Sequence, residues 1–155
     1  MKRVRLEDIV AAIGADASEG VWYIDTECGT TEVITESIMD AVLAKCDFPA
    51  ELPADVKLMY KLAHAIVFDE DERYLKLPGQ LDILEWDIMR RFAQSRGEEP
   101  LGVELAECIR GTNAFRAFSI CVRKHRLTAA WQEYREVALR DVAVQFCEQH
   151  EIPFE

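Results

Sequence analysis

The sequence predicts an α+β fold that is predominantly helical, with a small antiparallel β-sheet packed by about five to six helices. Apolar residues recur at helical spacing along most of the 155-residue chain. β-branched and aromatic residues gather on both sides of one turn within residues 21–34. The chain is 50% hydrophobic and 30% charged, which is the balance of a globular protein. We expect residues 1–155 to form a single domain.

The N-terminal part of the chain predicts a helix and then a hairpin. Leu6, Ile9 and Ile13 give residues 4–13 an apolar stripe, and a glycine follows as a helix end. Residues 21–34 form two short strands in this prediction. The turn DTECG joins them, and its glycine tolerates the positive φ that such a turn needs.

The middle of the chain predicts two more helices and an edge strand. Thr35 can cap a helix that runs to about Lys45, and the two prolines within residues 48–55 mark a connector. A second helix is expected over about 55–68. Residues 74–77 are expected as a third short strand, at an edge of the sheet because a proline follows.

The C-terminal half predicts four helices. The first is capped by Asp82, with Glu85 in capping-box position, and the second is a short helix that ends near Gly111. The third covers about 113–126 and the last about 128–149, followed by a tail that can add a short strand.

Composition and cysteine usage narrow the class of protein. The net charge is −11, from 29 acidic and 18 basic residues, so most of the surface should repel nucleic acid and anionic lipid. No segment approaches the ~18 consecutive apolar residues of a membrane helix. Five cysteines at irregular spacing, with no CxxC pair, suit free thiols in a reducing compartment. We therefore expect a soluble cytoplasmic protein that does not bind membranes.

The chain carries no complete catalytic signature. The nucleophile elbow, the P-loop, the dinucleotide-binding glycine motif and the EF-hand calcium loop are all absent from the sequence. The seven glycines are scattered singly and do not form a phosphate-binding loop. We therefore favour a non-enzymatic role and expect no cofactor.

One segment differs in charge from the rest of the chain. Residues 108–132 contain five basic and no acidic residues, so the other 130 residues carry a net charge of −16. On a helix, Arg116 and Arg123 lie within about 20° of each other. The residues of this segment that we predict as an anion- or partner-binding surface are Arg110, Arg116, Ser119, Arg123 and Arg126.

Two interpretations of this basic segment remain open. It is either a contact for an anion or a nucleic acid, or a face that pairs with acidic residues of a partner or of the protein itself, such as 69–72. We favour the second, because charge runs usually mark solvated or self-paired faces. A DNA-reading helix-turn-helix is disfavoured by Glu107 in the turn and by the overall acidity.

Arg135 is a further candidate site residue. It projects into the apolar arc of the last helix, where a structural ion pair explains a guanidinium better than a ligand does. We expect no metal site. The disfavoured alternative is a zinc site, since two pairs of side chains have helical spacing for shared ligation: Cys121 with His125, and Cys147 with His150.

Four segments together resemble a bacterial group known as uncharacterised protein family one-five-eight. They are YIDTECG at 23–29, LPGQLDILEWDIMRRFAQS at 77–95, IRGTNAFRAF at 109–118 and WQEYREVALRDVAVQFCEQHEI at 131–152. The resemblance covers nearly the whole chain and implies a bacterial cytosolic protein that forms one unit. Arg116, Arg135 and Arg140 match the pattern. Thr112, Asn113 and Ala117 depart from the family's more basic GRGAFRRF, which weakens the case for a strongly cationic helix.

The sequence does not identify a molecular function. Our preferred hypothesis is a non-catalytic interaction module that binds a protein partner or a second copy of itself. The alternative is an anion- or nucleic-acid-binding protein that uses the basic helix at 113–126.

Overall fold

A computed structural model describes residues 1–45, 51–79, 85–97 and 100–155. These residues form seven α-helices, one short 3-10 helix and one three-stranded antiparallel sheet, which confirms the predicted α+β, mostly helical class. The seven helices lie in the seven segments where the sequence pattern predicts them. Short segments of eight or nine residues form complete helices here because each buries an apolar face. None of the described helices has both the length and the hydropathy needed to cross a bilayer.

The chain divides into two compact units. The sheet unit comprises residues 1–80 and 143–155, and the helical unit comprises residues 81–142. The expectation of a single domain over 1–155 stays a prediction.

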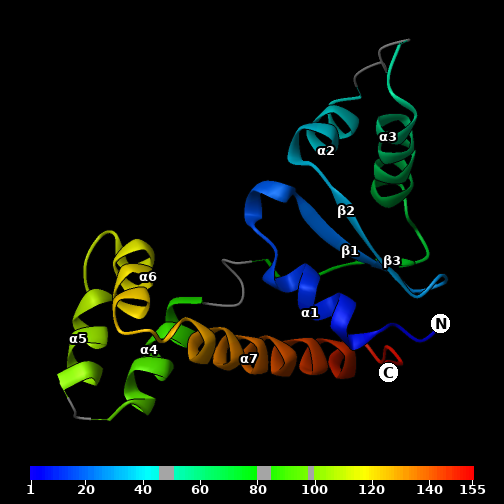
Figure 1. Ribbon diagram of the computed structural model, residues 1–155. Coiled ribbons are helices and arrows are strands. Elements are labelled where there is room, and N and C mark those ends of the chain that lie inside the picture. The colour runs from blue at the N-terminus through cyan, green and yellow to red at the C-terminus, as the bar shows by residue number, and fades with distance from the viewer. Residues whose placement is uncertain (46–50, 80–84, 98–99) are drawn as a thin grey trace. The chain divides into compact units, whose positions relative to one another are not determined.

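The sheet has the strand order β2-β1-β3 (Figure 1). β1 (Val21–Asp25) and β2 (Thr30–Ile34) form the predicted hairpin, and Gly29 takes a φ of 74° in the turn between them. β3 (Tyr74–Lys76) pairs with the other side of β1. β3 is an edge strand, as the proline after it predicted.

An ion pair fastens the hairpin turn to the segment that enters β3. Asp25 is only 5% exposed, and its carboxylate accepts hydrogen bonds from Arg73 Nε at 2.9 Å and Nη2 at 2.7 Å. The same carboxylate accepts the backbone N–H groups of Glu27 and Cys28. The Arg73 guanidinium holds the pKa of Asp25 at about 2, below its ordinary value of 3.8. The turn therefore depends on one buried charge.

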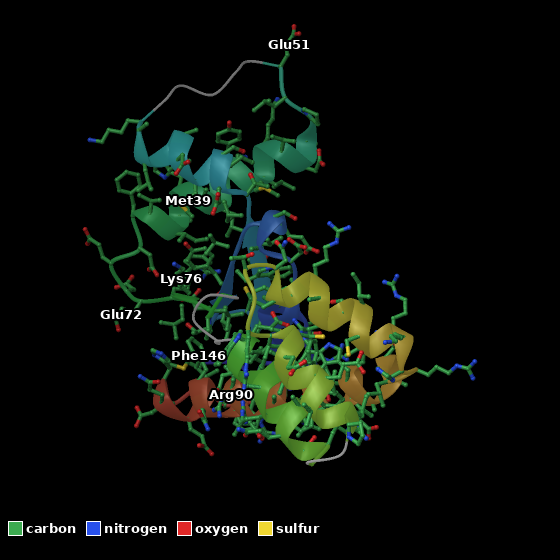
Figure 2. All side chains as sticks on the ribbon, turned by 90° about the vertical axis from the view of Figure 1, so that its left-hand side faces the viewer. Met39, Glu51, Glu72, Lys76, Arg90 and Phe146 are labelled. Atoms are coloured by element: carbon green, nitrogen blue, oxygen red, sulfur yellow. The ribbon has the colours of Figure 1, made fainter. Side chains whose placement is uncertain are left out.

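Three helices pack in the sheet unit. α1 (Leu6–Gly14) buries its predicted apolar stripe. α2 (Glu36–Leu43) and α3 (Ala54–Val67) share a core with the end of β2, against which Met39 also packs (Figure 2). The 3-10 helix η1 covers Ala17–Glu19. Thr35 precedes α2, but its side chain makes no capping hydrogen bond.

The C-terminal tail pairs with the N-terminal segment by a single parallel bridge, between Val4 and Phe154, rather than by a strand. Leu6 N donates to Glu155 O, and Glu155 N donates to Val4 O. These bonds hold the described chain ends together within the sheet unit.

The helical unit is built on four helices, α4 (Glu85–Ser95), α5 (Pro100–Cys108), α6 (Ala114–Lys124) and α7 (Thr128–Gln149), whose last turns belong to the sheet unit. Phe92 lies at the centre of the helical unit, and its side chain is 1% exposed. The Phe92 ring lies edge-on to those of Phe118, Trp131 and Tyr134, with ring centroids 6.1, 5.2 and 5.3 Å away. The predicted cap Asp82 lies outside the described residues.

Candidate functional site

The predicted basic helix is α6, and its arginines lie on the solvent side. Arg116, Ser119 and Arg123 are exposed, whereas Phe118 and Val122 are buried in the core of the unit. This is the arrangement that the helical spacing predicts.

Phe115 departs from the prediction. At helical spacing Phe115 falls on the same side as Phe118 and Val122, which predicts an inward position, but its side chain is 58% exposed. Ala114, one residue earlier, takes the buried position at the start of α6. The exposed face of α6 therefore combines two arginines with an aromatic ring and with Ile120, which is 55% exposed.

The basic residues of this segment have different partners. Lys124 donates to Glu104 at 3.0 Å. Among the described residues, no carboxylate forms an ion pair with Arg110, Arg116, Arg123 or Arg126, all of which are exposed. The structure thus brings Arg116 and Arg123 together on a positive face of α6, with Ser119 between them along the helix and without an ion pair to any described carboxylate.

Arg135 is an ion-pair residue, as predicted. Its Nε donates to Oε1 of Glu85, and the two side chains are only 24% and 13% exposed. The pair links α7 to the first turn of α4. Arg135 is therefore a structural residue of the helical unit, separate from the exposed arginines of α6.

The four residues of the alternative zinc site are not gathered into one cluster. Cys121 and His125 lie together with Glu104, and the potential ligand atoms of these three are within 4.8 Å of one another. Cys147 is fully buried in the sheet unit, and the ring of His150 stacks near Phe146. Among the described residues, Glu104, Cys121 and His125 are the grouping whose ligand atoms are close enough to share one ion.

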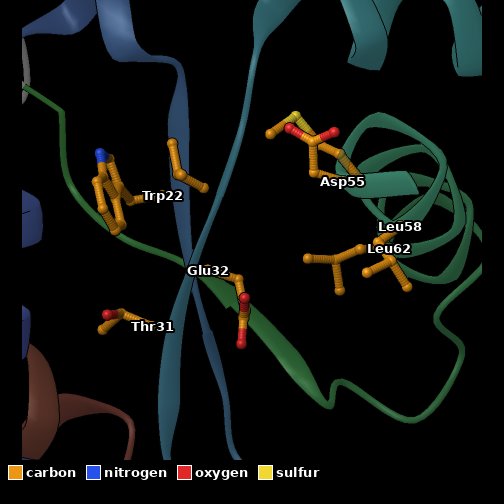
Figure 3. Close-up of a pocket in the computed structure, with 8 residues that line it drawn as sticks. Trp22, Thr31, Glu32, Asp55, Leu58 and Leu62 are labelled. Carbon is orange, nitrogen blue, oxygen red and sulfur yellow. The ribbon is translucent and has the colours of Figure 1, made fainter. Parts of the chain in front are cut away.

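The sheet unit has a groove that sequence reasoning missed. It lies between the hairpin and α3 and has a volume of about 400 Å³ (Figure 3). Its lining residues are Trp22, Thr31, Glu32, Val33, Asp55, Leu58, Met59 and Leu62. Leu58 has helical spacing with Leu62 and Ile66, which predicts an inward position on an apolar stripe, but it is 65% exposed at this groove.

The groove borders the open edge of β2. Leu77 N donates to Trp22 O, so the main-chain groups of Trp22 point toward β3. Main-chain groups alternate along a strand, and Tyr23 therefore bonds with Glu32 across the hairpin. The N–H and C=O groups of Thr31 and Val33 consequently point away from β1, where the described residues provide no neighbouring strand.

The groove is lined by both acidic and apolar side chains. Glu32 and Asp55 line it from β2 and α3, and Leu58 adds exposed apolar surface (Figure 3). The β-branched segment TTEVI identified β2 as a strand, but the free side of that strand depends on the position of β3 and α3. No local pattern in the sequence indicated it.

Comparison with protein-family models, curated proteins and solved structures finds no significant match. The resemblance to uncharacterised protein family one-five-eight therefore stays a prediction.

Proposed function

We propose that this protein is a non-catalytic interaction module that binds an extended segment of a partner protein along β2. The segment would add a fourth strand to the sheet, a recognised mode of peptide binding. The observation that carries the proposal is the open edge of β2. The outward main-chain groups of Thr31 and Val33 lie beside a groove whose far wall is α3.

The charges of the groove select the kind of partner. Glu32 and Asp55 favour a segment in which basic residues alternate with apolar ones. Leu58, Met59 and Leu62 offer apolar surface to the residues between them. Self-association along this edge is less favourable, because two copies of the chain would place like charges opposite each other.

The sequence also bears on the cellular compartment in which we propose that this binding occurs. Free thiols and an acidic surface suit a cytoplasmic protein, and the family resemblance implies a bacterial one; we propose a bacterial cytoplasm as its setting. The partner would be another cytoplasmic protein with a basic, strand-forming segment.

A short synthetic peptide that alternates valine and lysine, with blocked ends, tests the proposal. The expected result is saturable binding, measured by isothermal calorimetry, that weakens as salt rises. Val33→Pro removes one outward N–H without removing a β1–β2 hydrogen bond, since Val33 sits opposite Trp22 in a non-hydrogen-bonded pair. Loss of that bond should weaken binding about 10-fold.

Two controls make the test specific. Val33→Thr keeps the N–H and the shape of the side chain, so it should bind the peptide like the unmodified protein. A peptide N-methylated on every residue should not bind, because it lacks the main-chain donors along both of its edges. Equal binding of both peptides, or no effect of Val33→Pro, would contradict strand addition.

A second candidate function rests on α6. Arg116 and Arg123 are exposed and form no ion pair within the described part of the chain, and Phe115 on the same helix is an exposed ring. Arginines beside an aromatic ring suit single-stranded nucleic acid, whose phosphates and bases they contact respectively. The net charge of −11 opposes this function over the rest of the surface.

Fluorescence anisotropy with labelled single-stranded RNA and DNA distinguishes this second function. The double variant Arg116→Ala, Arg123→Ala should abolish detectable binding at moderate salt if α6 is the contact. Arg90→Ala is the matched control, since Arg90 is already paired with Asp87. If the unmodified protein binds neither RNA nor DNA detectably at low salt, the hypothesis of nucleic-acid binding is contradicted.

A further inference from the structure

The strongest unassigned cluster lies where α5 and α6 pack together in the helical unit. Glu104 and Cys108 are four residues apart on α5. Cys121 and His125 are four residues apart on α6 and at its C-cap. Side chains at this spacing lie on one face of a helix. Each helix therefore presents two potential metal ligands in one direction.

The contacts show that these side chains face each other. His125 Nε2 lies 2.8 Å from Glu104 Oε2. The ligand atoms of Glu104, Cys121 and His125 all lie within 4.8 Å of one another. Cys108, one helical turn from Glu104 on α5, lies outside this group of three, but its thiol neighbours that of Cys121.

The donor set is that of zinc. Cysteine sulfur, histidine nitrogen and carboxylate oxygen are its usual protein ligands, in a tetrahedron whose donor atoms are about 3.3–3.8 Å apart. The ligand atoms of Glu104, Cys121 and His125 lie within 4.8 Å of one another, so binding an ion at that spacing requires these side chains to move closer together. Magnesium and calcium prefer all-oxygen sites and do not fit two sulfurs.

We propose that Glu104, Cys108, Cys121 and His125 form a structural zinc site that joins α5 to α6. The ion bonds to both sulfurs, to Nε2 of His125 and to Oε2 of Glu104. The two thiol protons leave to solvent. A site with four protein ligands has no open position, so its role is to stabilise the helical unit.

Lys124 completes the charge balance. Two thiolates, a carboxylate and Zn²⁺ sum to one negative charge. The Lys124 ammonium lies 3.0 Å from Glu104 Oε1, which leaves Oε2 available to the ion. Such a contact to a ligating carboxylate orients it and neutralises the site.

Cobalt and zinc titrations of the full chain, reduced and stripped of metal, test the site. One equivalent of Co²⁺ should give the intense visible bands of tetrahedral coordination and a thiolate charge-transfer band. One equivalent of Zn²⁺ should displace it and raise the Tm. A weak, octahedral cobalt spectrum, or no binding, would overturn the proposal.

Variants assign the ligands. Cys121→Ser and His125→Gln should each weaken zinc binding by about 100-fold or more, measured by competition with a chromophoric chelator. Cys28→Ser, at an exposed cysteine of the sheet unit, is the control and should bind zinc normally. Cys108→Ser, at a partly exposed position, gives a second test if Cys121→Ser does not fold. Normal zinc affinity in both His125→Gln and Cys108→Ser would overturn the site.

Discussion

Replacing Asp25 by asparagine is expected to lower the unfolding free energy of the sheet unit by about 2–4 kcal/mol. The substitution keeps an acceptor for the turn N–H groups but removes the charge that binds Arg73. The guanidinium, one-third exposed, keeps its ion pair with Glu27 and its position over the Tyr74 ring. Urea denaturation followed by circular dichroism and tryptophan fluorescence measures the loss.

The same substitution should change the acid sensitivity of the protein. The pKa of Asp25 is about 2 in the folded chain, mainly because of the Arg73 hydrogen bonds, and 3.8 is its ordinary value. A lowered pKa stabilises the fold above pH 3.8, and this contribution is lost as the pH falls toward 2. The contribution is about 2 kcal/mol, so the stability gap between the unmodified protein and Asp25→Asn should narrow over that range.

Glu27→Gln is the matched control for this prediction. Glu27 also contacts Arg73, at 2.8 Å, but its side chain is 68% exposed. Exposed ion pairs contribute about 0–1 kcal/mol, so this variant should unfold close to the unmodified protein. Equal destabilisation by both substitutions would show that burial of Asp25 does not set the strength of the pair.

Phe92→Ala is expected to destabilise the helical unit by about 3–5 kcal/mol. The side chain is 1% exposed, and its ring contacts three other aromatic rings, from α6 and α7. Truncation leaves a cavity that neighbouring helices fill only in part. The expected readout is an early loss of helical signal and of Trp131 fluorescence in a urea titration.

Phe115→Ala provides the comparison within the same unit. The Phe115 ring is 58% exposed, so its removal should change stability by less than about 1 kcal/mol. If Phe92→Ala were as mild as Phe115→Ala, the aromatic cluster would not be the core of this unit.

Local signals predicted most of the elements. The hairpin was predictable because β-branched residues flank a turn that needs one positive φ, which Gly29 takes at 74°. The ion pair of Arg135 was predictable because a guanidinium on an apolar arc needs a partner. Capping was predicted less well. Thr35 and Asn113 precede helices, yet neither side chain makes a capping hydrogen bond.

The candidate sites depend on contacts between distant segments, which periodicity does not reveal. Leu58 lies on an apolar stripe, but α3 packs so that this residue borders the groove. The sequence pattern paired Cys121 with His125. Cys147 and His150, the second pair of the alternative zinc site, belong to the sheet unit instead. Glu104 became a candidate only when α5 was seen packed against α6.

The most direct test of strand addition is a two-dimensional amide NMR titration with the alternating valine–lysine peptide. Strand addition predicts the largest shift changes at Thr31 and Val33, with slowed hydrogen exchange of both amides as they gain partners. Shift changes confined to Arg116, Arg123 and their neighbours on α6, with none along β2, would contradict it.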